Sequence, residues 1–257
     1  MEYSLAGGGK RLRPLLCLAS AESLGIAAEK ALPLAAAIEF IHTYSLIHDD
    51  LPALDDDDTR RGKPSSHKKY GEAVALLTGD ALLTEAFSEL AQLAKHFEPA
   101  VIPKTIEHLC HAAGVRGMVG GQLLDVTTNP DQFSVPEVEF IHIHKTGAMI
   151  LGSVLIPCVL NGLTPKDPKY LAYRRYGEAL GLAFQISDDI LDSEATFRYS
   201  RGPRKKPKPS YAKLAAPSEM RERLQRLVDG AIFAIESSGD KTEPLVDIAN
   251  FIRTRRI

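Results

Sequence analysis

Apolar residues recur at helical spacing along most of the chain, and this is its main signal of secondary structure. The spacing predicts helices at about residues 15–24, 32–50, 73–94, 104–126, 137–160, 170–191, 218–237 and 245–254. Prolines and glycines separate several of these segments, and no stretch shows the two-residue alternation of a strand. No internal repeat or low-complexity boundary divides the chain. We therefore predict an all-α fold in a single domain, residues 1–257.

The helix predicted at 32–50 ends in a dense acidic cluster. Six carboxylates fall within ten residues, beginning with Asp49 and Asp50 and including Asp55, and Arg60 and Arg61 follow at once. So many like charges repel one another unless a cation holds them together. Mg²⁺ accepts carboxylate oxygens and takes its other ligands from water and substrate phosphates, which the planar arginine side chains also suit. The cluster favours a metal–diphosphate site, with a solvated acidic loop as the alternative.

The position of Asp55 raises a geometric difficulty. In an ideal helix, a residue six positions after Asp49 lies about 240° further round the axis, whereas one four positions away lies about 40° round it. Pro52 stands between the two aspartates and cannot continue a regular helix. We therefore expect the chain to kink or loop near Pro52, so that both carboxylates reach one face.

A second acidic cluster, Asp188, Asp189 and Asp192, ends the helix predicted at 170–191. Asp188 and Asp192 stand four residues apart and share a helical face with Gln185, one turn earlier. Two helices that each present aspartates can face one another across a bundle and hold metal ions between them, with diphosphate completing the coordination. This repetition argues against the solvated-loop interpretation of the first cluster.

Four motifs together resemble a known enzyme family. GGKRLRP at 8–14, DDLPALD at 49–55, KTG at 145–147 and DDILD at 188–192 resemble the short-chain trans-prenyl diphosphate synthases, most of all bacterial-type farnesyl diphosphate synthases. The resemblance implies an antiparallel helical bundle of the isoprenoid synthase type with a central metal–diphosphate cavity. It also implies a homodimeric prenyltransferase that uses three Mg²⁺ ions, bound with the allylic diphosphate. Such an enzyme joins isopentenyl diphosphate head to tail to dimethylallyl or geranyl diphosphate and gives farnesyl diphosphate.

The resemblance also assigns roles to individual residues. It implies the metal ligands Asp49, Asp50, Asp55, Asp188 and Asp192, and the catalytic residues Asp49, Asp55, Lys145, Thr146 and Asp188. It implies isopentenyl diphosphate contacts at Lys10, Arg13, His42 and Arg61, and other substrate contacts at Arg60, Lys145, Thr146, Gln185 and Lys208. Taken alone, a glycine-rich turn before a helix is more often a plain cap, and a lone histidine on an apolar helix more often packs in the core. A kink at 145–147 would expose Lys145 and Thr146 to an anion.

The chain departs from the family pattern after the second acidic cluster. The segment 193–209 is several residues shorter than the corresponding family loop and lacks its Gly-Lys pair. Lys208 is the only residue of this segment to which the resemblance assigns a role. We expect an aberrant, mobile loop here, incomplete closure over the diphosphates, and a weak or inactive enzyme. Met1 also lies only a few residues before GGKRLRP, where family members usually have a helix, which suggests a shortened form.

Residues just before the first acidic cluster bear on the chain length of the product. Tyr44 and the small Ser45 lie five and four residues before Asp49, or about 6–7.5 Å back along the helix. In the family, an aromatic residue at this place closes the floor of the hydrocarbon channel and limits the product to C15. We therefore expect farnesyl diphosphate, with geranylgeranyl diphosphate as the alternative if Tyr44 only packs between helices.

Composition narrows the remaining alternatives. A formal net charge of −2 gives no electrostatic basis for nucleic-acid binding. The sequence has no run of eighteen apolar residues, which would indicate a membrane span. It also has no basic-then-apolar leader, which would indicate export. The three cysteines lie in apolar surroundings without metal-ligand spacing, as free thiols in a reducing, cytoplasmic compartment would. A class I terpene cyclase, an inactive regulatory subunit of a prenyl synthase and an acidic Ca²⁺-binding protein stay open as alternatives.

Overall fold

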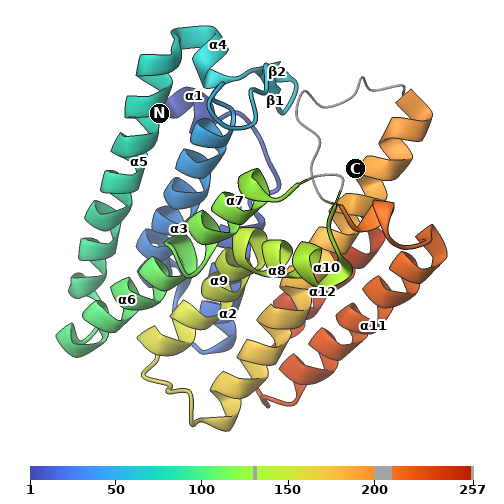
Figure 1. Ribbon diagram of the computed structural model, residues 1–257. Coiled ribbons are helices and arrows are strands. Elements are labelled where there is room, and N and C mark those ends of the chain that lie inside the picture. Colours follow the sequence, from blue (N-terminus) through green and yellow to red (C-terminus); the bar gives the residue numbers. More distant parts are fainter. Residues whose placement is uncertain (130–131, 200–209, 256–257) are drawn as a thin grey trace.

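The computed structural model describes residues 1–129, 132–199 and 210–255, and nearly all of its regular structure is helical (Figure 1). The α-helices are α1 (Glu2–Leu5), α2 (Leu12–Ser23), α3 (Ala28–Asp49), α4 (Ser66–Tyr70), α5 (Glu72–Gln92), α6 (Ile102–Ala113), α7 (Met118–Thr127), α8 (Val135–His142), α9 (Ala148–Leu160), α10 (Pro168–Tyr199), α11 (Pro217–Glu236) and α12 (Glu243–Thr254). The short helices are η1 (Leu93–Lys95), η2 (Pro99–Val101), the π-helical η3 (Ile143–Gly147) and η4 (Tyr211–Lys213). β1 (Thr59–Arg60) and β2 (Lys63–Pro64) form a small antiparallel hairpin in which Thr59 pairs with Pro64. The all-α prediction is confirmed.

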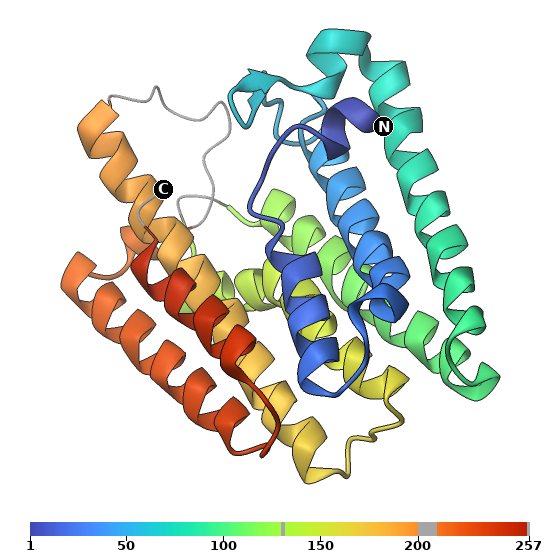
Figure 2. The same ribbon diagram turned by 180° about the vertical axis from the view of Figure 1, so that it is seen from behind.

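Two hydrophobic clusters hold the bundle together. One joins α10, α11 and α12, and the other joins α3, α5 and α6. α2 and α9 contribute side chains to both clusters, and Figures 1 and 2 show these two helices between the two groups. Burial on all sides explains why α9 reads as one continuous apolar run rather than as an amphipathic stripe.

One helical run is apolar and long enough to cross a membrane. It spans Val135–Leu160, and 61% of its apolar window is buried inside the protein. A core helix of a globular bundle passes the same test of length and composition, and the packing of α9 against α2 and α10 accounts for the apolar character here.

Three helix boundaries differ from the sequence prediction. The segment predicted as one helix at 104–126 is divided into α6 and α7 at residues 114–117, where Gly114 and Gly117 interrupt it. The helix predicted at 137–160 is interrupted by the π-helical η3. The prediction that the second acidic cluster ends its helix is wrong, because α10 continues to Tyr199. Residues 193–199, expected in a loop, contain no glycine or proline and so nothing that stops a helix. The rest of that predicted loop, 200–209, lies outside the described residues.

The ends of several elements converge at one end of the bundle. The C-terminal end of α3 and the C-terminal half of α10 lie on either side of this end, and the hairpin lies close to the end of α3 (Figure 1). In both views the N-terminal segment between α1 and α2 runs between these two helices (Figures 1 and 2). The two acidic clusters and the GGKRLRP segment are therefore presented at the same end of the molecule.

Candidate active site

The loop after α3 brings Asp55 back to Asp49. α3 ends at Asp49, and the chain then turns so tightly that the N–H of Leu54 donates to the carbonyl of Leu51 at 2.9 Å. The N–H of Asp55 donates to the carbonyl of Asp49 at 2.8 Å. Asp56 has a positive φ of 53°, a conformation that aspartate adopts more readily than most residues. The loop expected near Pro52 from the helical angles is confirmed, and the two aspartates are adjacent through their backbones.

Asp50 holds Arg60 in place. The Asp50 side chain is buried, and Arg60 Nε donates to its two carboxylate oxygens at 3.0 and 3.3 Å, with a further bond from Nη2. Arg60 also reaches Asp57 Oδ2 at 3.3 Å. Burial raises the pKa of Asp50, while the hydrogen bond and charge of Arg60 oppose that rise. The pair fixes the guanidinium next to the acidic loop, a contact that the sequence did not predict, and metal ligation by Asp50 stays a prediction.

Lys145 faces the first acidic cluster from the π-helical segment. Its Nζ donates to Asp125 Oδ2 at 2.5 Å. Burial lowers the pKa of Lys145, but the negative charges of Asp125, Asp49 and Asp55 outweigh burial and raise it above the usual value. Lys145 is therefore a permanent cation within electrostatic reach of both Asp49 and Asp55. The single π turn at this point matches the kink expected at KTG, and such turns recur at functional sites.

Close backbone packing positions this lysine. A Cβ atom on Gly121 of α7 would lie 2.1 Å from the backbone nitrogen of Lys145, so only glycine allows α7 to approach η3 this closely. Gly114, Gly117 and Gly120 differ from Gly121, because a Cβ on each would instead meet a backbone carbonyl just before it in the chain. The same contact places Asp125, one turn after Gly121, against the Lys145 ammonium.

The three aspartates of the second cluster have different surroundings. Asp188 accepts from Arg255 Nη2 at 2.8 Å; burial raises its pKa, and the charges of Arg255 and Lys10 lower it. The charge of Asp192 also raises the pKa of Asp188, as expected for carboxylates that share a helical face. Asp189 instead accepts the N–H of Tyr211 at 2.7 Å, and burial raises its pKa to about 6. Asp189 thus ties α10 to η4.

Basic side chains of the N-terminal segment meet α3. Arg13 is buried, and its Nη1 lies 3.3 Å from His42 Nε2. Burial lowers the pKa of Arg13 to about 10. Burial and then the charge of Arg13 hold the pKa of His42 well below its usual value, so His42 is neutral and accepts from Arg13. Arg61, whose charge also acts on both residues, donates through Nη1 to the carbonyl of Gly8. Arg13, His42 and Arg61 are therefore brought together as predicted.

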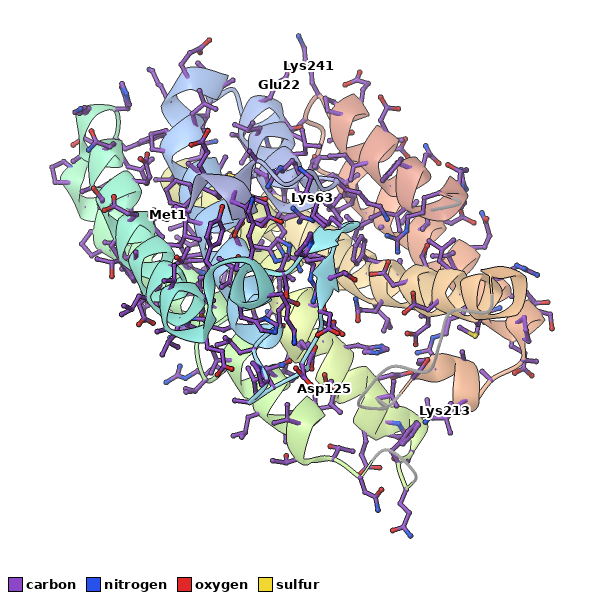
Figure 3. The ribbon with its side chains drawn as sticks, turned by 90° about the horizontal axis from the view of Figure 1, so that it is seen from above. Met1, Glu22, Lys63, Asp125, Lys213 and Lys241 are labelled. Atoms are coloured by element: carbon purple, nitrogen blue, oxygen red, sulfur yellow. The ribbon has the colours of Figure 1, made fainter. Side chains whose placement is uncertain are left out.

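The other predicted residues are placed as follows. Lys10 interacts electrostatically with Asp188 and Arg255, on the α10 side of the N-terminal segment. Thr146 and Gln185 are half-buried on η3 and α10, and Asp192 is exposed on α10. Lys208 lies outside the described residues. The predicted incomplete closure over the diphosphates concerns the same loop and stays a prediction. Figure 3 looks down on this end of the molecule, with Asp125 and Lys63 near the middle of the view and Glu22 and Lys241 at its rim.

A further carboxylate and imidazole group borders the acidic loop. Possible ligand atoms of Asp56, Asp58 and His67 lie within 4.8 Å of one another. His67 is buried and its Nδ1 lies 3.1 Å from Ser65 Oγ, while Lys68 Nζ pairs with Asp58 at 2.9 Å. These residues stand beside the predicted metal ligands and are not among them.

Comparison with known proteins agrees with this geometry. The family model described as "Polyprenyl synthetase" matches residues 1–201. A geranylgeranyl diphosphate synthase of Cyanophora paradoxa is 44% identical over 99% of this chain and 86% of its own length. A farnesyl diphosphate synthase of Geobacillus stearothermophilus is 49% identical over 76% of this chain and 65% of its own length. The crystal structure of a Helicobacter pylori geranyltransferase, complexed with magnesium and isoprenyl diphosphate, superposes with a TM-score of 0.83 at 29% identity, covering 98% of this chain and 84% of that one.

The helical fold, the two aspartate clusters and the facing cations define an enzyme of the isoprenyl diphosphate synthase class. The chain belongs to the polyprenyl synthetase family and is a prenyltransferase. The resemblance of the four sequence motifs to trans-prenyl diphosphate synthases is thereby confirmed.

Proposed function

We propose that this chain condenses isopentenyl diphosphate with dimethylallyl or geranyl diphosphate, in a Mg²⁺-dependent reaction, to give farnesyl diphosphate. The observation that carries the proposal is the convergence of Asp49, Asp55 and Lys145 at one end of the bundle. Two carboxylates beside a permanent cation are suited to a metal–diphosphate complex, because the metal binds the carboxylates and the lysine binds phosphate oxygens.

The donor set fits Mg²⁺. The Asp49–Asp55 backbone hydrogen bond brings these two residues together in one turn, and both carry hard carboxylate donors. Asp188 and Asp192, four residues apart on α10, offer two more. We propose that these groups hold three ions together with the allylic diphosphate. Bound there, Mg²⁺ supplies Lewis-acid neutralisation of the diphosphate leaving group.

Lys145 and Arg60 would act on the allylic diphosphate. Both are held by buried carboxylates, Lys145 by Asp125 and Arg60 by Asp50, so their charges are positioned before substrate arrives. Negative charge grows on the diphosphate as the allylic C–O bond breaks, and fixed positive charges stabilise that change. The resulting allylic cation is attacked by the double bond of isopentenyl diphosphate. A proton is then lost to the departed diphosphate, so no protein base is required.

Arg13, His42, Arg61 and Lys10 would hold isopentenyl diphosphate. The neutral His42 ring accepts from Arg13 and fixes the orientation of its guanidinium. Arg61 is anchored to the backbone of the glycine-rich segment, so the anion would be surrounded by cations from two separate parts of the chain. Water has little access to the buried Arg13, which strengthens its interaction with a phosphate oxygen.

We propose a C15 product limited by Tyr44. The Tyr44 ring is buried and packs edge-on against His48, with ring centroids 5.7 Å apart. It also belongs to the hydrophobic cluster shared by α3 and α5. A rigid ring held on two sides suits the end wall of a hydrocarbon channel. A C20 product is the second candidate, because the Cyanophora relative that matches 99% of this chain is named as a geranylgeranyl diphosphate synthase.

We also propose that the chain forms a homodimer in the cytoplasm. Large apolar side chains are exposed along two helices, with Val74 and Leu77 on α5 and Val119 and Leu123 on α7. An exposed apolar face of this kind is typical of a subunit interface. Cys17, Cys110 and Cys158 are all free thiols, which suits a reducing compartment.

Product analysis tests the proposed reaction and its chain length. The purified chain is incubated with Mg²⁺, isopentenyl diphosphate and each of dimethylallyl, geranyl and farnesyl diphosphate in turn. We expect C15 product from the first two, no elongation of farnesyl diphosphate, and no product after EDTA treatment. A C20 product would establish the second candidate, and condensation that persists in EDTA would contradict the metal assignment.

A further inference from the structure

The C-terminal end of the chain places an arginine on the second acidic cluster. Arg255, the residue after α12, lies against α10, where its Nη2 is 2.8 Å from Asp188 Oδ1. Its Nε donates to Ser187 Oγ at 2.7 Å, and Nη2 donates to the carbonyl of Phe184 at 2.7 Å. The guanidinium also stacks over the Phe184 ring, 4.1 Å from its centroid. Arg255 is thus held by several contacts in one orientation.

This arrangement is built rather than incidental. The Arg255 side chain is 1% exposed, whereas a solvent-facing arginine that pairs with a carboxylate stays mostly exposed. The hydroxyl of Ser187 also donates to the carbonyl of Ile252 at 3.2 Å, which fastens the end of α12 to α10. One donor, Nη1 of Arg255, is buried without a hydrogen-bond partner among the described residues, so the site has capacity for a further acceptor.

The positive charges around Asp188 affect its ability to bind a metal ion. Asp188 is proposed above as a metal ligand, yet a guanidinium already neutralises it, and the ammonium of Lys10 interacts with the same carboxylate. A divalent ion bound at Asp188 would lie within a few ångströms of the Arg255 guanidinium and would be repelled by it. Metal and arginine therefore compete for one carboxylate.

We propose that Arg255 is an internal counter-ion of Asp188 that competes with divalent metal, so that metal binds at the second acidic cluster only when the arginine leaves this carboxylate. The relevance of this competition to synthesis rests on the proposed function, in which the second acidic cluster binds Mg²⁺. In that case, Arg255 controls metal binding at α10. Once displaced, the guanidinium could donate from Nη1 to a phosphate oxygen, close to Lys10.

Direct metal binding tests this without substrate turnover. Mn²⁺ is titrated into the full chain, alone and with inorganic diphosphate, and free Mn²⁺ is measured by electron paramagnetic resonance. Arg255→Gln keeps an amide donor near the position of Nε for the Ser187 contact but removes the charge. We expect Mn²⁺ to bind this variant about tenfold more tightly. Arg255→Lys keeps the charge, and we expect its Mn²⁺ affinity to stay close to that of the unchanged protein.

The two variants separate charge from shape. Equal Mn²⁺ affinity in the unchanged protein and Arg255→Gln would overturn the proposal, as would an equal gain in Arg255→Gln and Arg255→Lys, which would reflect loosened packing. Adding Asp188→Asn to Arg255→Gln should abolish the gain, and a gain that survives would place the metal elsewhere and contradict the proposal. The readout needs no condensation reaction, so a chain without synthase activity still decides the question. If Arg255→Gln does not change the Mn²⁺ affinity, this proposal fails but the proposed condensation reaction is not contradicted.

Discussion

The N–H of Asp55 donates a 2.8 Å hydrogen bond to the carbonyl of Asp49, which closes a six-residue separation into one compact turn. In a continuous helix the two side chains would point about 120° apart round the axis. Ending α3 at Asp49 and reversing the chain is what allows both to face Lys145. The acidic motif therefore works through its loop geometry as well as through its charges.

The approach of α7 to the π-helical segment predicts the effect of Gly121→Ala. The added Cβ would lie 2.1 Å from the backbone nitrogen of Lys145, so one of the two backbones must move. We expect a loss of about 1–3 kcal/mol in the free energy of unfolding and a marked loss of activity, because Lys145 is displaced. The measurements are urea unfolding and steady-state turnover.

Gly230→Ala is the matched control for that substitution. Gly230 lies inside α11, and a Cβ there would have no neighbouring atom within 4 Å. We expect a gain of about 0.5–1 kcal/mol in stability and unchanged turnover, since alanine favours the helix. Equal effects of the two substitutions would contradict the close-packing explanation.

The buried His142 predicts how stability depends on pH. Burial lowers its pKa from 6.5 to about 4, and its Nδ1 has no hydrogen-bond partner among the described residues. As pH falls below 6.5 the unfolded chain takes up a proton that the folded chain refuses, so stability is lost from pH 6.5 down to about 4. The lowered pKa corresponds to about 3 kcal/mol over this window.

His142→Phe removes this titration while keeping a ring of similar size. We expect the variant to lose less stability than the unchanged protein between pH 7 and pH 4.5, as measured by urea unfolding at a series of pH values. The remaining slope includes the neutral His42, whose pKa is lowered in the same direction. Parallel pH profiles for the two proteins would refute the assignment.

The position of Tyr44 predicts control of product length. Tyr44→Ala removes the ring that packs against His48, and we expect the product to shift from C15 towards C20 as the channel deepens. Tyr44→Phe keeps the ring and should leave the product at C15. Chain lengths are read by chromatography of the hydrolysed products. The same product from Tyr44→Ala and Tyr44→Phe would show that Tyr44 serves only the packing of α3 on α5.

Local sequence patterns predicted much of this structure. Helical periodicity located α3 and α5 to within a few residues, because these helices bury apolar side chains at regular spacing. The helical angle between Asp49 and Asp55 correctly predicts the loop at the end of α3. The acidic cluster does not mark the end of its helix: residues 193–199 contain no glycine or proline, and α10 continues to Tyr199.

Long-range pairs account for most of what the sequence did not reveal. Asp189 binds the backbone of Tyr211, and Asp188 binds Arg255, which lies 67 positions further along the chain. No local spacing encodes such contacts, since they depend on how α10 packs against α11 and α12. The Asp50–Arg60 pair is shorter in range, yet it depends on the β hairpin, whose two-residue strands are too short to show a period.

Mg²⁺-dependent turnover of three aspartate variants tests the central claim most directly. Turnover with isopentenyl and geranyl diphosphates is measured across a range of Mg²⁺ concentrations for Asp49→Ala, Asp188→Ala and the control Asp247→Ala, an exposed aspartate of α12. We predict that the first two lose several orders of magnitude in turnover and that Asp247→Ala is unaffected. Asp49→Ala should keep its melting temperature, whereas Asp188→Ala should melt lower because the buried Arg255 loses its counter-ion. Near-normal turnover by Asp49→Ala or Asp188→Ala in Mg²⁺ would contradict the metal–diphosphate site.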